Sequence, residues 1–272
     1  MIKFSVLMSV YAKEKSDNLR LAIESIINQT YKPDEFVIVA DGPLPVDLNR
    51  IIEEYKREYS KLIKVIYLRE NMGLGKALDI GLLNCRNEYI ARMDSDDISK
   101  LERFEKQFKY LSSNPQVDIL GTSIDEFNEE NIIISQRNVP LDDIEIKRYI
   151  KTRSPFNHPT VIFKKSKVMI FGGYGKLARK QDMDLFSRML FNGCIGANLN
   201  ESLLLFRSDN NNFKRRKSYN NISSYIKVIK KNYLRKYISL TDFLFVIFAQ
   251  VLILLVPMWL FKIINRKILR KR

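Results

Sequence analysis

The sequence contains little cysteine and a single histidine. Among 272 residues there are two cysteines, Cys85 and Cys194, which lie far apart without Cys-x-x-Cys spacing or a metal-ligand pattern around them. A disulfide framework or a structural zinc site needs a denser set of such residues. We therefore expect two reduced thiols in a cytosolic protein.

Two nucleotide-binding motifs are also absent. No Gly-x-Gly-x-x-Gly follows the first apolar run, and no Gly-x4-Gly-Lys-Ser/Thr occurs anywhere in the chain. A dinucleotide fingerprint and a P-loop are therefore both unsupported. The N-terminus has a short apolar run, one lysine before it and no small-x-small cleavage site, unlike a secretory signal peptide. We interpret it as the first core strand.

The positive charge lies at one end of the chain. The formal net charge is +15, yet residues 207–272 hold 16 lysines and arginines against two acidic residues, whereas residues 1–206 hold 30 basic and 29 acidic residues. A basic face spread over a folded domain would indicate nucleic-acid binding. The distribution instead predicts a nearly neutral body and a strongly basic tail, so no nucleic-acid partner is expected.

Strand-like and helical patterns alternate through the first part of the body. This alternation is typical of βα units, and it predicts an α/β fold with a mostly parallel sheet covered by helices on both faces. At 46% hydrophobic residues the chain is able to bury a substantial core. The expected strands cover residues 2–10, 35–40, 62–68 and 88–93, and the expected helices lie near 18–28, 48–59, 74–83 and 99–111.

Polar residues follow each expected strand. Ligands bind at the carboxyl ends of the strands in such sheets, so these residues indicate where a site lies. Singly, Asp41-Gly42-Pro43 is also typical of a plain turn, and Asn71-Met72-Gly73 of a bend before a helix. The full series is Tyr11 and Ala12, then Asp41 and Gly42, then Arg69, Asn71 and Gly73, then Asp94, Asp96 and Asp97.

Three carboxylates within four positions end the last of these strands. Such charges repel one another and lose water on burial, so a cation or a set of donors must compensate them. In an extended segment Asp94 and Asp96 point the same way while Ser95 faces away. Carboxylate oxygens suit Mg²⁺ or Mn²⁺, which also bind substrate phosphates. The cluster predicts a metal-bound diphosphate; the alternative, that Asp96 or Asp97 caps the next helix, leaves Asp94 unexplained.

The ordered blocks of sequence resemble a known family. Residues 6–42, 69–82 and 87–107 resemble the nucleotide-binding half of a family 2 glycosyltransferase with the Rossmann-like GT-A fold, most strongly the short bacterial enzymes that build O-antigen or capsule repeat units. The resemblance runs from about Ile2 to about Phe206. It implies inverting transfer of a sugar from a nucleotide donor, usually a uridine diphosphate sugar, with Mn²⁺ or Mg²⁺ as the metal.

The resemblance also implies a division of the chain. Residues 1–206 would form the GT-A domain, with a nucleotide-sugar-binding half at 1–112 and an acceptor and catalytic-base half at 113–206. Residues 207–272 would form a helical extension that associates with the membrane.

The donor site that the resemblance implies starts from three aspartates. Asp41 takes the role of hydrogen-bonding the nucleobase, with the turn at Tyr11 packed near it. Asp94 resembles the ribose-side or metal-side carboxylate of the Asp-x-Asp triplet, and Asp96 resembles its metal ligand.

Two basic residues and an asparagine in the second block complete this implied pocket. Arg69, Asn71 and Lys76 line it where a cation meets the donor phosphates. Many relatives have Arg-Asn where this chain has Leu78-Asp79, so we place no phosphate-binding arginine there.

The catalytic base is expected in the second half of the body. Inversion needs a carboxylate that takes the proton of the acceptor hydroxyl. Residues 179–186 resemble the acidic block that starts a helix in the family, which makes Asp182 the predicted base. Gln181 stands where glutamate is common. Asp184 is the alternative, with a favourable charge in the first helical turn as its other role.

His158 and a glycine-rich segment lie in the same half. An isolated histidine is more often packed than bound to a metal. The block around His158, however, resembles one in related enzymes where a histidine reaches the metal or the diphosphate, so we predict a metal ligand. Gly172–Gly175 is interpreted as a flexible loop over the acceptor side, with a plain turn as the alternative.

The tail contains a long apolar run. Residues 243–261 include no charge over 19 positions, near the minimum for a membrane span. Basic residues flank both sides, whereas a single crossing normally leaves one side depleted, and Gln250 and Pro257 interrupt the run. We expect an interfacial or re-entrant helix that binds anionic lipid at the cytoplasmic face of the bacterial inner membrane. A transmembrane span and a soluble core helix are the alternatives.

The combined interpretation is an inverting glycosyltransferase of surface polysaccharide assembly, whose acceptor glycan is carried on polyprenyl diphosphate. A sugar-phosphate nucleotidyltransferase would need a glycine-rich basic loop after the first strand, which residues 9–17 do not provide. A non-catalytic lipid-binding or nucleic-acid-binding protein gives no reason for carboxylates at the sheet edge.

Overall fold

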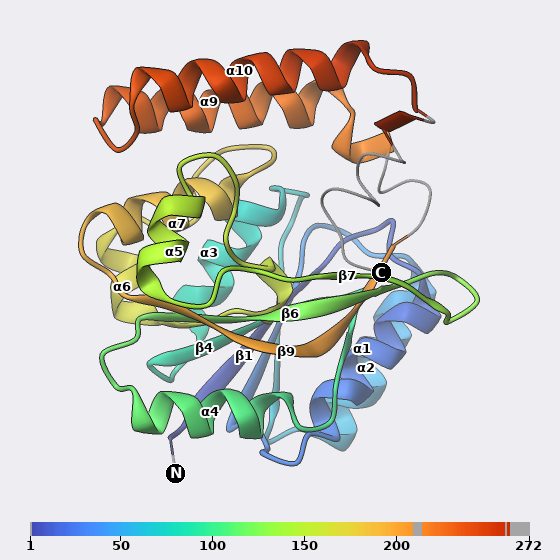
Figure 1. The fold of residues 1–272 in the computed structure, drawn as a ribbon. Coiled ribbons are helices and arrows are strands. Elements are labelled where there is room, and N and C mark those ends of the chain that lie inside the picture. The colour runs from blue at the N-terminus through green and yellow to red at the C-terminus, as the bar shows by residue number, and fades with distance from the viewer. Residues whose placement is uncertain (1, 209–213, 259, 262–272) are drawn as a thin grey trace.

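One mixed sheet forms the centre of the molecule. The computed structural model describes residues 2–208, 214–258 and 260–261. In this part of the chain the strands are β1 Phe4–Val10, β2 Glu35–Ala40, β3 Ile63–Tyr67, β4 Tyr89–Asp94, β5 Ile98–Ser99, β6 Ile119–Phe127, β7 Ile133–Arg137, β8 Ile162–Lys164 and β9 Gly196–Arg207. These nine strands follow the order β3-β2-β1-β4-β8-β6-β9-β5, with β7 paired to β6 (Figure 1).

The first four strands form the parallel unit that the sequence predicts. β1 pairs in parallel with β2 and β4, and β2 pairs in parallel with β3. Every residue of β1 and β2 is buried, as continuous apolar runs require when helices cover both faces of a sheet. The helices that connect these strands are α1 Ser16–Ile27, α2 Val46–Glu58 and α3 Leu74–Asn84, close to the predicted positions.

The second half adds antiparallel pairs. β8 runs antiparallel to both β4 and β6, β7 antiparallel to β6, and β5 antiparallel to β9, while β6 and β9 are parallel. A short turn joins β6 to β7, and short connections allow antiparallel pairing only, because parallel strands need a crossover of a dozen or more residues. The prediction of a mostly parallel sheet thus describes the N-terminal half.

Helices cover the sheet on both faces, as predicted. The remaining helices are α4 Arg103–Ser113, α5 Asp143–Tyr149, α6 Lys165–Ile170, α7 Gln181–Phe191, α9 Tyr219–Leu234, α10 Leu240–Leu255 and the short 3-10 helix η1 His158–Thr160. One core packs α1, α2 and α4 against the sheet, and the other packs α3, α5, α6, α7 and α9.

Helices α9 and α10 form a helical hairpin on one side of the molecule (Figure 1). Ile222, Tyr225, Val228 and Ile229 of α9 are buried in the core that contains α7. Helix α10 buries Val246 and exposes most of its other apolar side chains. No helix within the described ranges is long and apolar enough to cross a membrane.

The apolar run of the tail is only partly seen as a helix. A capping box at Ser239 and Asp242 starts α10, and the helix ends at Leu255, two residues before Pro257. Pro257 cannot continue the backbone hydrogen bonding of the helix. Trp259 and the basic segment 262–272 lie outside the described residues.

We expect both thiols to be unreactive in the folded protein. Burial raises the pKa of Cys85 to about 12 and that of Cys194 to about 11, so little thiolate forms at pH 8. A disulfide reagent that reports thiolate release should react slowly with the native protein and with both cysteines after unfolding in guanidinium. Rapid stoichiometric reaction of the native protein would contradict this packing.

Candidate active site

The acidic cluster lies at the carboxyl end of β4. β4 ends at Asp94, and Ser95 and Asp96 form a turn rather than an extended strand. The hydroxyl of Ser95 donates a 2.7 Å hydrogen bond to Glu14 Oε2. Asp94, Asp96 and Asp97 each bring one carboxylate oxygen within 4.8 Å of the other two.

The electrostatics of this cluster suit a cation. Burial and the charges of Asp94 and Glu14 raise the pKa of Asp96 to about 7. Burial and its two neighbours also raise the pKa of Asp97 well above the ordinary value. One buried oxygen of Asp97, Oδ2, accepts no hydrogen bond from any described residue. Three oxygen donors with this much repulsion fit a divalent metal.

Two arginines, the buried Arg92 and the partly exposed Arg207, contact the acidic cluster. Arg92 is fully buried; its guanidinium pairs with Asp94 and donates to the carbonyl of Leu7 at 3.3 Å. Arg207 donates its backbone N–H to Asp97 Oδ1 at 2.9 Å and its Nε to the carbonyl of Asp96 at 3.0 Å. Sequence reasoning missed both arginines, although a charged residue two positions before Asp94 in an apolar strand was a visible signal.

Neither Asp96 nor Asp97 caps the helix that follows, contrary to the alternative considered for them. Helix α4 starts at Arg103 with Glu102 at its N-cap. The short strand β5 lies between the cluster and this helix, so the aspartates are too far from its free N–H groups.

A second group of predicted residues meets at the ends of β1, β2 and β3. Asp41 is buried, and its Oδ1 accepts a 2.7 Å hydrogen bond from the backbone of Met72. The amide of Asn71 donates to the carbonyl of Asp41 at 3.1 Å. The backbone N–H of Asp41 donates to Val10 at 2.7 Å, next to Tyr11. The structure thus brings Tyr11, Asp41 and Asn71 together.

Arg69 and Lys76 are both exposed near this group. Arg69 lies in the loop after β3, and Lys76 lies in the first turn of α3. Neither side chain forms a hydrogen bond or an ion pair with another described residue, so the structure does not fix them in the group.

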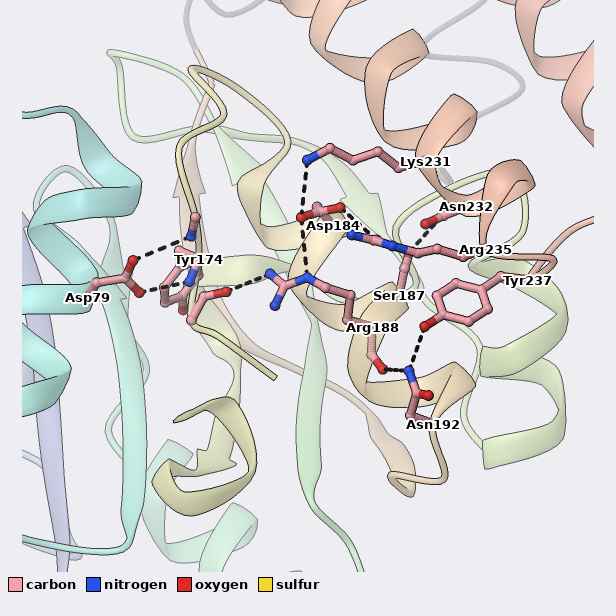
Figure 2. Close-up of polar contacts among 12 residues, drawn as sticks. Asp79, Tyr174, Asp184, Ser187, Arg188, Asn192, Lys231, Asn232, Arg235 and Tyr237 are labelled. Atoms are coloured by element: carbon pink, nitrogen blue, oxygen red, sulfur yellow. Dashed lines mark hydrogen bonds and ion pairs between the residues drawn. The ribbon is translucent and has the colours of Figure 1, made fainter. Parts of the chain in front are cut away.

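The loop Gly172–Gly175 is tied to α3 and α7 (Figure 2). Asp79 accepts hydrogen bonds from the backbone N–H groups of Tyr174 at 2.8 Å and Gly175 at 3.4 Å. Arg188 donates to the carbonyl of Gly173 at 2.6 Å. Gly173 has a φ of +67°, and a Cβ there would lie 2.3 Å from Asp79 Oδ1. Asp79, which stands in a pair of positions where many relatives have Arg-Asn, holds this loop.

His158 contacts the same loop. Its Nε2 lies 3.0 Å from the hydroxyl of Tyr174. Burial, together with the positive charge of Arg92, lowers the pKa of His158 to about 3, so the imidazole is neutral at physiological pH. The group of possible metal ligands in the described residues consists of the three aspartates and does not include His158. Metal ligation by this residue stays a prediction.

Asp182 and Asp184 have different surroundings although both lie in the first turn of α7. Residues two apart on a helix point in nearly opposite directions. Asp184 is buried against Arg188 Nε at 3.3 Å, Arg235 Nη1 at 3.2 Å and Lys231 Nζ at 3.8 Å (Figure 2). Asp182 is half-buried and makes no hydrogen bond or ion pair with a described residue. Asp182 is therefore the carboxylate available for chemistry.

The fold defines the class of protein. The solved structure of the mannosyltransferase PcManGT from Pyrobaculum calidifontis, in complex with GDP-Man and Mn²⁺, matches with a TM-score of 0.66 at 13% identity. The match covers 92% of this chain and 69% of that chain. The mixed sheet and its helices have the fold of the GT-A glycosyltransferases.

The particular family follows from the sequence. The family described as Glycosyl transferase family 2 matches residues 5–184, and the chain belongs to it. The UDP-Gal:alpha-D-GlcNAc-diphosphoundecaprenol beta-1,3-galactosyltransferase of Escherichia coli is 37% identical over 273 residues, 99% of this chain and 97% of that protein. The amylovoran biosynthesis glycosyltransferase AmsE of Erwinia amylovora is 37% identical over 227 residues, 84% of each chain.

Removal of the Asp184 carboxylate should destabilise the protein. Asp184→Ala leaves three cations facing one another, and because two of them are partly exposed we expect a loss of about 1–3 kcal/mol in the free energy of unfolding. The matched variant Asp182→Ala should stay within about 1 kcal/mol of the native protein. Denaturant unfolding measures both, and equal losses would contradict the assignment.

Proposed function

We propose that this glycosyltransferase moves a sugar, with inversion, from a uridine diphosphate sugar to a hydroxyl of an oligosaccharide carried on polyprenyl diphosphate. The observation that carries the proposal is the cluster of three carboxylates at the end of β4. Asp182, which has no partner among the described residues, is near the same tyrosine, Tyr174, as Asp94. The E. coli relative, whose name specifies UDP-Gal and a diphosphoundecaprenol acceptor, covers almost the whole chain. Membership in the family disfavours a nucleotidyltransferase or a non-catalytic binding protein.

The donor would bind along the ends of β1 to β4. Asp41, held by the backbone of Met72, presents a carboxylate to the nucleobase beside Tyr11 and Asn71. Asp94 and Asp96 are the residues that would hold a divalent metal. A bound metal supplies positive charge that stabilises the leaving diphosphate. Arg69 and Lys76 are exposed at the same edge and are able to reach donor phosphates.

Asp182 would take the proton of the acceptor hydroxyl. The negative charges of Asp182, Asp79 and Asp94 all act on the buried hydroxyl of Tyr174 and contribute to its raised pKa, after burial as the main cause. Asp182 and Asp94 of the acidic cluster are therefore both near Tyr174. Transfer from a bound donor to an acceptor requires the base and the donor site to be close together.

The helical hairpin would bind the enzyme to the cytoplasmic face of the inner membrane. The outer surface of α10 is apolar, and α9 adds exposed lysines at Lys227 and Lys230. Such a surface combines apolar insertion with attraction to anionic headgroups. The large exposed side chains of α10 are Leu240, Leu244, Phe245, Phe248, Val251, Leu252, Leu254 and Leu255.

Two substitutions separate donor binding from turnover. Asp96→Ala should abolish Mn²⁺-dependent binding of a uridine diphosphate sugar, measured by calorimetry over a panel of nucleotide sugars. Asp182→Ala should bind the donor normally but lose about 100-fold or more in kcat, because general base catalysis is removed. Asp47→Ala, at an exposed carboxylate of α2, is the control and should change neither.

Normal turnover by Asp182→Ala would place the base elsewhere. If no nucleotide sugar binds the native protein with any metal, the proposed function itself is wrong.

The apolar surface of α10 should mediate membrane binding. Leu244→Glu with Phe248→Glu should lower binding to anionic lipid vesicles by roughly tenfold or more, since two apolar side chains no longer enter the interface. Leu83→Glu, at an exposed position of α3, is the matched control. Vesicle co-sedimentation measures the difference, and unchanged binding by the double variant would refute the role of α10. Deletion of the whole tail is less informative, because α9 packs on α7.

A further inference from the structure

Basic side chains gather at the start of α7. Lys180 is the N-cap of this helix and has a left-handed backbone, with a φ of 61°. Its ammonium lies 5.0 Å from the centre of the Tyr225 ring of α9. A lysine in this backbone region is uncommon, and such positions often lie at functional sites.

A segment after α5 brings two arginines to the same place. The hydroxyl of Tyr225, whose ring lies next to Lys180, donates to the carbonyl of Thr152 at 2.5 Å. Arg153 follows Thr152 directly, and Arg137 donates to the carbonyl of Ser154 at 2.8 Å. Residues 152–154 therefore bring Arg137 and Arg153 close to Lys180.

The cations are close enough to affect one another. Burial, together with the charges of Arg137, Arg216 and Arg153, lowers the pKa of Lys180 to about 8, while Asp182 opposes this. In the described part of the chain, neither Lys180 nor Arg153 donates a hydrogen bond or forms an ion pair through its side chain. Two cations held near other positive charges, with no acceptor of their own among the described residues, favour an anion, above all one with several negative charges.

We propose that Lys180 and Arg153, with Arg137 beside them, bind the diphosphate of the lipid-linked acceptor. This inference rests on the proposed function and assigns the acceptor side of that site. A diphosphate offers several anionic oxygens to these three cations. The proposed base Asp182 follows Lys180 by two residues, so the hydroxyl of an acceptor bound here would be near the group that takes its proton.

The position of the cations favours the acceptor over the donor. The donor diphosphate would already meet positive charge at the acidic cluster, where Asp94 and Asp96 would hold a divalent metal. The cations at the start of α7 lie instead between α5 and Tyr225 of α9, under the hairpin whose outer helix exposes apolar side chains. A diphosphate attached to a membrane lipid approaches from the hairpin side.

Steady-state kinetics with two acceptors test the assignment. The probes are one sugar carried on a short-chain alkyl diphosphate and the same sugar as a neutral alkyl glycoside. Lys180→Asn, which tolerates the left-handed backbone, and Arg153→Ala should each raise the KM for the diphosphate acceptor at least about tenfold. The activity with the neutral glycoside and the KM for the nucleotide sugar should stay within about twofold. Lys180→Arg should restore most of the loss.

A control variant and a binding measurement distinguish a diphosphate site from a structural role. Lys176→Ala removes an exposed lysine from the preceding loop and should behave as the native protein does. An equal loss with both acceptors would mean a structural role, and a raised KM for the nucleotide sugar alone would assign the cations to the donor; either result overturns the inference. Calorimetry with the alkyl diphosphate sugar alone tests the site without turnover. Binding that both variants lose would support the inference even if no donor is used and the proposed function fails.

Discussion

The repulsion among three carboxylates at the end of β4 is the constraint on which the site depends. Two features of the sheet oppose it. The parallel register places Leu7 opposite Arg92, so the buried guanidinium reaches both the Leu7 carbonyl and Asp94. The pairing of β5 with β9 brings the backbone of Arg207 to Asp97. The compensation is incomplete, since burial and the charges of Asp94 and Glu14 still raise the pKa of Asp96 to about 7, and a cation would relieve this cost.

Local patterns predict the first half of the fold and miss the second for a physical reason. β1 to β4 are continuous apolar runs joined by amphipathic helices, so each unit is specified within a short stretch of chain. β5 has two residues and β8 has three, too few for any periodicity. Their positions depend on partners distant in sequence, such as Leu204 and Leu205 for β5, and no local pattern contains that information.

The residues of the candidate site also fall into those that local sequence predicts and those that depend on distant contacts. Residue type and place after a strand were enough to select Tyr11, Asp41 and Asn71, which the structure brings together. Which carboxylate is free depends on partners from other elements. Asp182 and Asp184 are equivalent in sequence as first-turn acids, but Arg235 at the C-cap of α9 pairs with Asp184 and nothing described pairs with Asp182. The hydrogen bonds by which Asp79 holds the loop could not be predicted either, because Tyr174 and Gly175 are distant from Asp79 in the sequence.

The ion pairs of Asp184 fix the helical hairpin relative to Asp182. Beyond the pairs at Asp184, Asn232 of α9 donates to Ser187 of α7 at 3.0 Å, and Asn192 at the end of α7 donates to Tyr237 at 2.6 Å. These contacts run along α7, whose first turn contains Asp182, so the apolar surface of α10 keeps a set orientation toward the site. If α10 lies in the headgroup layer, a diphosphate at the membrane surface meets the cations under α9 first. The glycan beyond it then extends toward Asp182 and the donor.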